Sequence, residues 1–211
     1  MYTFRLALAS ILLIIVIGVP AGVICAANRY SLFDHAATIF TLLGICAPGF
    51  WIGLMLQLLF AVKIPLFPLI GGEGLSSLVL PAFTVSAFSI ANVTRMTRTN
   101  MLEVLNQDYI RTALSKGLSR RTVLTKHALR NAMNNTITII GLEFGYLLGG
   151  TVITEMVFAY PGIGRYMIQA IYMRDYPVVQ GVVLLVAATY VVVNTLTDIS
   201  YALMDPRIQF E

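Results

Sequence analysis

Five long apolar runs divide this sequence and constrain its fold more than any other feature. An α-helix rises about 1.5 Å per residue, so roughly 20 apolar residues cross the hydrocarbon core of a bilayer. Only 11% of the residues are charged, whereas soluble globular domains carry about 25%. The sequence therefore predicts an all-α membrane protein, with residues 1–211 forming a single transmembrane domain. Its five expected transmembrane helices lie near residues 4–27, 36–62, 78–94, 133–158 and 177–203.

The second run contains a helix breaker. Pro48 and Gly49 lie near its middle. A proline inside a helix removes one backbone hydrogen bond and crowds the preceding turn. Transmembrane helices tolerate such residues by bending, so we expect a bend at this point.

A basic interval, residues 95–132, separates the third and fourth runs. Its only acids are Glu103 and Asp108. Loops rich in Lys and Arg stay on the cytoplasmic side, which places this interval inside and the N-terminus, residues 63–77 and residues 160–176 outside. The charge is thus explained by membrane topology rather than by a nucleic-acid partner. The basic residues are Arg95, Arg98, Arg111, Lys116, Arg120, Arg121, Lys126 and Arg130.

The same interval has helical periodicity. Apolar residues from Leu102 to Ala113 recur at steps of three and four, which is one face of an amphipathic helix. Gly117 is expected to end this helix and Ser119 to cap a second one. The expected shape is two short helices around a glycine turn, across the cytoplasmic mouth of the protein. An equally good interpretation of these residues is a solvated basic loop that only orients the spans.

Two segments of this interval carry a family resemblance. Asp108–Leu118, followed by Lys126–Ala132, resembles the cytoplasmic coupling loop of permeases from ABC importers of dipeptides, oligopeptides and nickel. In that family the loop carries an acid, small residues and a glycine at this spacing, and it docks in a cleft on the ATPase subunit. The Glu-Ala-Ala of the broader motif corresponds here to Arg111–Ala113. The resemblance implies a type I ABC importer permease fold with a helix–Gly–helix coupling loop.

The resemblance also implies roles for residues of the loop. The ATPase contact is expected to comprise Tyr109, Ala113, Gly117 and Leu118, and the polar rim Arg111 and Lys116. The full set of expected ATPase-coupling residues is Asp108, Tyr109, Arg111, Ala113, Lys116, Gly117, Leu118 and His127.

Other segments are similar to the same family along most of the chain. They are Ala47–Trp51 in the kinked span, Glu155–Gly164 in an external Pro-Gly segment, Arg174–Gly181 at the start of the last span and the terminal signature Asp205–Arg207. Residues 3–22 resemble the family's second span. The family's first span and an extracytoplasmic segment, which both precede that second span, are therefore expected to be missing, through a truncated gene, a late start or a naturally short variant.

The function implied by this resemblance is that of a permease subunit. It would serve an ATP-driven importer of peptides, nickel or metal chelates in the bacterial cytoplasmic (inner) membrane. Its expected partners are a second permease subunit, ABC ATPase subunits that bind ATP and magnesium, an extracytoplasmic solute-binding protein and the lipid bilayer. The chain has no Gly-x-x-x-x-Gly-Lys-Ser/Thr phosphate loop. We therefore expect no cofactor and no catalytic residue in it.

Glu143 is the costliest residue of this chain to place in a membrane. It lies about ten residues into the fourth run, roughly 15 Å deep, where an acid faces a cavity or a partner rather than lipid. One interpretation is a polar group on the translocation path, with Asn92 and Gln57 as further members. The other is a protonated or internally paired acid. Asp198, near the inner end of the last run, is expected to be structural.

Glycines recur at every fourth position on one face of the fourth run, at Gly141, Gly145 and Gly149. Small residues at this spacing let two helices approach closely. They are expected to pack against a helix, either of a partner permease or of this chain.

Neither a metal site nor a disulfide is expected. His35 and His127 are far apart and lack partners at the spacing of metal ligands. Cys25 and Cys46 both lie in apolar runs, which predicts two buried thiols.

Two other functions remain open on the sequence. One is a self-sufficient channel or proton-linked carrier that uses Glu143 and Asp198. Internal inverted repeats would favour it, and none is evident. The other is an inactive, truncated permease that folds but does not transport.

Overall fold

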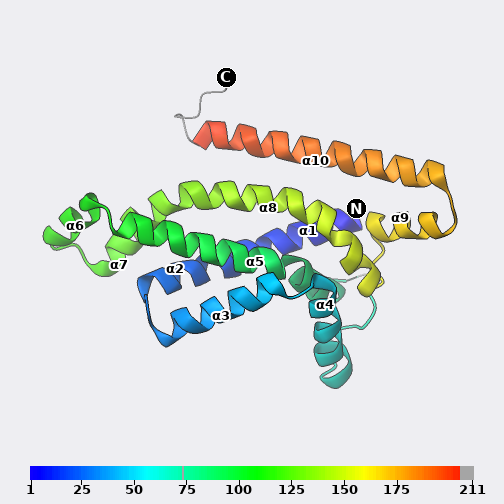
Figure 1. The fold of residues 1–211 in the computed structure, drawn as a ribbon, viewed down its shortest axis with the longest axis horizontal. Coiled ribbons are helices and arrows are strands. Elements are labelled where there is room, and N and C mark those ends of the chain that lie inside the picture. The colour runs from blue at the N-terminus through cyan, green and yellow to red at the C-terminus, as the bar shows by residue number, and fades with distance from the viewer. Residues whose placement is uncertain (73, 205–211) are drawn as a thin grey trace.

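The computed structural model describes residues 1–72 and 74–204, and every regular element in this part is a helix. Three continuous helices and two bent helix pairs there are long and apolar enough to cross a bilayer (Figure 1). The sequence prediction of an all-α membrane protein with about five spans is confirmed. The side chain of Asp198 and the segment Asp205–Arg207 lie outside the described residues.

The first span is continuous but not uniform. It consists of α1 (Tyr2–Leu13), the π-helical turn η1 (Ile14–Gly18) and α2 (Val19–Ala27). Pro20 has no N–H to donate to the preceding turn, and its ring crowds the carbonyl there. The widened turn η1, which ends two residues before Pro20, accommodates the ring without ending the span.

The second span is broken. It consists of α3 (Leu32–Cys46), α4 (Gly49–Gln57) and the π-helical turn η2 (Leu58–Lys63), with an angle of 109° between the two parts. Pro48 separates them with an extended backbone, so the bend expected from the sequence is confirmed. In Figure 1, α4 leaves the bundle at a steep angle to α3.

The third span, α5 (Ser76–Leu105), lies at the centre of the molecule. It packs against α1, α2, α3, α4 and α8. The helix continues to Leu105, well past the expected end near residue 94. Its last turns bury Thr97, Asn100 and Met101 against the rest of the protein, so they continue the packed helix although the sequence there is polar and basic. Residues 95–105 of the expected loop are therefore part of α5.

The remaining elements are α8 (Leu129–Val157), α9 (Ile163–Tyr172) and α10 (Tyr176–Met204). The axis of α8 bends by 54° between its segments 135–147 and 149–157. In Figure 1, α10 runs alongside α8 and points back towards the end of the molecule where α6 and α7 lie, which we call the loop end. The N-terminus and α9 lie at the opposite end.

Two apolar clusters hold the bundle together. The larger one lies between α1, α5 and α8 and includes Leu6, Ile14 and Val93. The smaller one lies at the loop end and comprises Ala26, Met101, Ile110, Ala113, Val123, Ala128 and Ala132. Many large apolar side chains outside these clusters are exposed, as expected for helices that face lipid.

The two cysteines differ in their surroundings. Cys25 is buried, as expected, but Cys46 is exposed, so the prediction of a second buried thiol was wrong. Cys46 is the last residue of α3, directly before the bend, where the helix turns away from the bundle and leaves it uncovered.

Candidate functional site

A helical loop connects α5 and α8 at the loop end of the bundle. It contains α6 (Asp108–Ser115), the short α7 (Arg120–Thr122) and the π-helical turn η3 (Val123–Ala128). The loop projects beyond the ends of the spans in Figure 1. It begins after Leu105 and joins α8 without a break, so both α5 and α8 lead directly into it.

The turn at Gly117 depends on its backbone conformation. Gly117 has a φ of +81°, a region that residues with a side chain rarely adopt. Its N–H donates to the carbonyl of Leu114 at 2.9 Å, and that of Leu118 donates to the carbonyl of Ala113 at 3.3 Å. A Cβ on Gly117 would meet no atom within 4 Å. The glycine is thus needed for its backbone angle rather than for space, and the predicted helix end is confirmed.

The second helix of the loop begins at the predicted cap. The Ser119 hydroxyl accepts a hydrogen bond from the Thr122 backbone N–H at 3.3 Å. This satisfies one of the unpaired donors at the start of a helix. From Arg120 the chain continues as helix into α8.

The first helix of the loop differs from the expectation. The apolar residues from Leu102 to Ala113 do not share one helix, because α5 ends at Leu105 and α6 starts at Asp108. Asn106 and Gln107 lie between them. Asn and Asp side chains compete with the backbone for hydrogen bonds and favour helix ends, which explains the break.

The helix α6 has one buried and one exposed face. Ile110 and Ala113 are buried in the loop-end cluster. Ala113, expected at an ATPase contact, is only 7% exposed and lies behind the surface. Tyr109 is exposed, and its hydroxyl accepts a hydrogen bond from Asn131 at 2.7 Å. His127 is half-buried in η3.

The exposed face of the loop combines apolar and basic side chains. Its apolar members are Tyr109, Leu114 and Leu118. Arg111 and Lys116 are exposed beside them. The Arg111 guanidinium lies 3.7 Å from Asp108, with both side chains in solvent. An ion pair of this kind contributes at most about 1 kcal/mol, so it leaves the residues available to a partner.

Glu143, on α8, is hydrogen-bonded to α5. Its side chain accepts hydrogen bonds from Ser89 Oγ at 2.5 Å and from Asn92 Nδ2 at 2.6 Å, both on α5. The residue is 7% exposed. The side-chain oxygen Oδ1 of Asn92 in turn accepts a hydrogen bond from Arg95 Nη2 at 3.3 Å. Of the two interpretations of this acid, these contacts match internal pairing.

Gln57 also makes internal contacts. Its amide nitrogen donates to the carbonyls of Leu69 and Val157 at 3.0 and 3.2 Å. It thereby joins α4 to the following loop and to the end of α8. A place for Gln57 and Asn92 on a translocation path stays a prediction.

The glycines of α8 have different neighbours. A Cβ on Gly145 would lie 2.8 Å from Asn194 Oδ1 and 3.2 Å from the Tyr190 ring, so α10 of the same chain packs closely there. Gly149 is exposed, and a Cβ on it would meet nothing within 4 Å. Gly141 is half-buried. The helix that packs against Gly145 is therefore α10 of the same chain.

Sequence reasoning missed two polar connections. Asp34, at the start of α3, is 3% exposed and binds Arg98 of α5. Glu155, near the end of α8, is fully buried and accepts from Thr3 Oγ1 at 2.6 Å and from the Arg165 backbone N–H at 3.0 Å. Arg98 looks like any other cation of the basic interval, so its sequence context carries no signal for this pairing.

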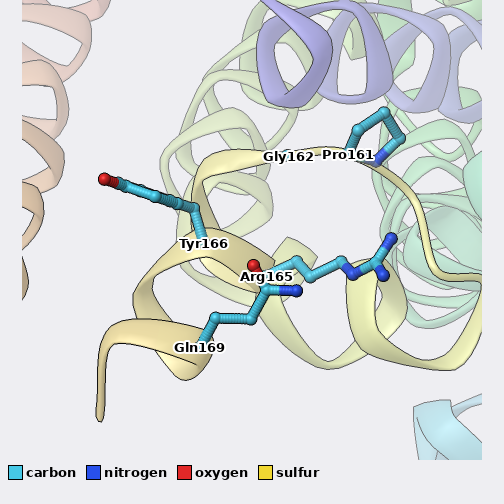
Figure 2. A pocket seen from close by; sticks show the side chains of 5 residues that line it. All are labelled: Pro161, Gly162, Arg165, Tyr166 and Gln169. Carbon is cyan, nitrogen blue, oxygen red and sulfur yellow. The ribbon is translucent and has the colours of Figure 1, made fainter. Parts of the chain in front are cut away.

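A shallow depression of about 340 Å³ lies at the opposite end of the bundle, on α9. Figure 2 shows Arg165 extending towards Pro161, while the Tyr166 ring points in the opposite direction to the Arg165 guanidinium. The Arg165 guanidinium donates to the carbonyl of Ala159. The residues that line the depression are Pro161, Gly162, Arg165, Tyr166 and Gln169.

No group of three or more His, Cys, Asp or Glu side chains that could hold a metal ion occurs in residues 1–72 and 74–204.

Comparisons with known proteins identify the family. The model of the family described as binding-protein-dependent transport system inner membrane component matches residues 18–210. The chain is 43% identical over 217 residues to a putative peptide transport system permease protein of Brucella abortus, covering 99% of this chain and 69% of that protein. It is 41% identical to the oligopeptide permease AppB of Bacillus subtilis, covering 99% and 69% of the two chains.

Two further proteins are similar. The dipeptide permease DppB of Escherichia coli is 41% identical over 238 residues, covering 98% of this chain and 70% of that one. The fold matches an inward-facing structure of the MetNI methionine ABC transporter with a TM-score of 0.80 and 17% identity, over 97% and 93% of the two chains. As the coupling-loop resemblance predicted, the chain belongs to the family of binding-protein-dependent transport system inner membrane components.

Proposed function

We propose that this chain is the membrane-spanning permease subunit of an importer that carries short peptides inward, driven by ATP hydrolysis on separate subunits. The similar curated proteins are named for peptide, oligopeptide and dipeptide transport, which favours peptides over nickel or metal chelates. The phosphate loop needed to bind ATP is absent from the sequence. ATP and magnesium would thus be bound by the partner ATPase.

The observation that carries this proposal is the helical loop between α5 and α8. Its outward side presents Tyr109, Leu114 and Leu118 with Arg111 and Lys116 beside them. Its inward side is anchored by Ile110 and Ala113. Apolar and aromatic residues with cations beside them are typical of a protein interface, which supports docking of this surface on an ATPase subunit.

The mechanism follows from the anchoring of the loop. A displacement imposed on α6 by the closing ATPase subunits cannot be absorbed locally, because Ile110 and Ala113 are packed into the bundle. Densely packed interiors move as bodies rather than deform. The displacement would therefore reach α5 and α8, which lead into the loop, and change access to a path between this subunit and a second permease.

The external partner would meet the opposite end of the bundle. The depression on α9 presents Arg165 and Gln169 together, and the guanidinium is held by the Ala159 carbonyl. A depression this open cannot enclose a peptide, whereas buried ligand sites cover about 70–90% of their ligand. It suits instead a side chain of an extracytoplasmic solute-binding protein that delivers the peptide.

The test is peptide uptake into proteoliposomes. The chain is reconstituted with its ATPase subunits, second permease and binding protein, and entry of a radiolabelled dipeptide is measured with and without ATP. We expect uptake to require ATP and to persist in the presence of a protonophore. Uptake without ATP that collapses with the proton gradient would instead establish a self-sufficient carrier.

A further inference from the structure

The end of the first span is capped from a distant part of the chain. The last carbonyls of a helix lack partners within it. At the end of α2, the Ile24 carbonyl accepts from the backbone and side-chain nitrogens of Asn28 at 3.0 and 3.1 Å. The Ala27 carbonyl accepts from Arg120 Nη2 at 2.5 Å. Arg120 belongs to α7 of the helical loop, 93 positions further along the chain.

A cation at this place has two reasons to bind. The carbonyl end of a helix carries partial negative charge, which attracts Lys and Arg. Arg also carries several donors in a planar fork, so it can hold a carbonyl in a defined direction. The hydrogen bond therefore fixes the position of α7 relative to the end of α2.

Apolar packing supports the same connection. Ala26, the residue before the capped carbonyl, belongs to the loop-end cluster together with Ile110 and Ala113 of α6 and Val123 of η3. The end of α2 is thus attached to both helices of the loop, through one polar contact and one apolar cluster.

The first span is in turn fixed to α5. A Cβ on Gly22 would lie 2.6 Å from the Thr94 carbonyl and 2.6 Å from Thr97 Cβ, so the two helix backbones touch there. Asp34 and Arg98 connect the start of α3 to α5 a turn nearer the loop. The ends of α2, α3 and α5 therefore form one packed unit under the loop.

We propose that Arg120 is a positioning residue that makes the inner end of the first span part of the unit moved by the ATPase subunits. This inference rests on the proposed function of the loop. The loop then drives the first span directly, in addition to the third and fourth spans between which it lies.

The test compares matched variants in the reconstituted transporter. Arg120→Ala removes the cap, Arg120→Lys keeps the charge and the ability to donate but loses the planar fork, and Arg121→Ala removes a neighbouring exposed cation of the same helix. Dipeptide imported per ATP hydrolysed is measured for each, with membrane yield and melting temperature as folding controls. We expect Arg120→Ala to lower this ratio about three- to tenfold, the range for one lost hydrogen bond.

The controls distinguish this inference from the proposed function. Arg120→Lys should recover part of the ratio, and Arg121→Ala should match the wild type. If the wild-type chain shows no ATP-dependent uptake, the proposed function fails. If the wild type imports dipeptide and Arg120→Ala behaves like Arg121→Ala, the inference about Arg120 alone is wrong.

A distance measurement gives a second readout. Spin labels at Arg29→Cys and Arg121→Cys, with Cys25 and Cys46 replaced by Ser, report the spacing between the end of α2 and α7. We expect this spacing to stay constant with and without ATP in the otherwise wild-type protein and to broaden when Arg120 is also replaced by Ala. A spacing that changes during the wild-type cycle would show that the first span does not move with the loop.

Discussion

Arg98 binds the carboxylate of Asp34 with two hydrogen bonds, Nε to Oδ1 at 2.6 Å and Nη2 to Oδ2 at 2.8 Å, across 64 positions of the sequence. Asp34 also accepts from the Tyr30 backbone N–H at 3.0 Å. Its side chain is 4% exposed and that of Arg98 27%. The pair thus fastens the start of α3 to the part of α5 that leads into the helical loop.

Breaking this pair should destabilise the protein. Asp34→Asn leaves the Arg98 guanidinium without its anion, so we expect a loss of about 2 kcal/mol in the free energy of unfolding, typical of a hydrogen bond to a charged group. The measurement is denaturant unfolding in detergent of Asp34→Asn, Arg98→Gln and the double variant. The loss in the free energy of unfolding should be smaller for the double variant than the sum of the losses for the two single variants.

The exposed pair Asp108 and Arg111, 3.7 Å apart, is the matched control. Asp108→Asn should change stability by less than about 1 kcal/mol, because both side chains are in solvent. Equal losses in the free energy of unfolding for Asp34→Asn and Asp108→Asn would contradict the structural role of Asp34.

Gly117→Val should uncouple ATP hydrolysis from uptake. A β-branched residue at a φ of +81° costs at least about 1–2 kcal/mol and displaces the turn. Insertion into the membrane should be unaffected, because the spans are unchanged. Uptake and ATPase activity are measured together in proteoliposomes.

Gly181→Ala serves as the control for the glycine substitution. Gly181 is in α10, and a Cβ there meets nothing within 4 Å. Alanine in a helix should be neutral or slightly stabilising. Normal uptake by Gly117→Val would contradict a docking role for the loop.

Glu143→Ala should destabilise the contact between α5 and α8. Ser89, which is fully buried, and Asn92, which is half-buried, would lose their acceptor, which costs about 1–3 kcal/mol. Glu143→Gln keeps one acceptor oxygen and should cost less. The melting temperature in detergent measures both.

Transport assays show whether Glu143 also contributes to selectivity. If Glu143 only connects α8 to α5 through hydrogen bonds, Glu143→Gln should leave the preference between cationic and neutral dipeptides unchanged. A loss of that preference in a normally folded variant would instead place the acid on the translocation path.

Glu155→Ala should release the start of α9. The carboxylate accepts from Thr3 Oγ1 and the Arg165 N–H, and Thr3 Oγ1 accepts from the Ile163 N–H at 2.8 Å. Without these acceptors, backbone amides at residues 163–165 should exchange hydrogen faster. Hydrogen–deuterium exchange by mass spectrometry measures this effect. Gln169→Ala, on an exposed part of the same helix, should leave the exchange unchanged, and equal exchange in both variants would show that Glu155 does not anchor α9.

The features determined by the sequence alone are local ones. Apolar run length predicted the spans, Pro48 predicted the bend, and Gly117 and Ser119 predicted the helix end and the cap within the loop. Each depends on the backbone chemistry of a few neighbouring residues. The motif around Asp108–Leu118 was sufficient to indicate the family, because it combines residue type and spacing over one short segment.

Only the tertiary structure decided how these elements meet. Arg98 and Arg120 both belong to the basic interval, yet one binds the acid Asp34 and the other the carbonyl of Ala27. The burial of Ala113 and the continuation of α5 to Leu105 likewise depend on what packs against them. Such contacts are set by the crossing and rotation of whole helices, which a run of residues along one chain segment does not specify.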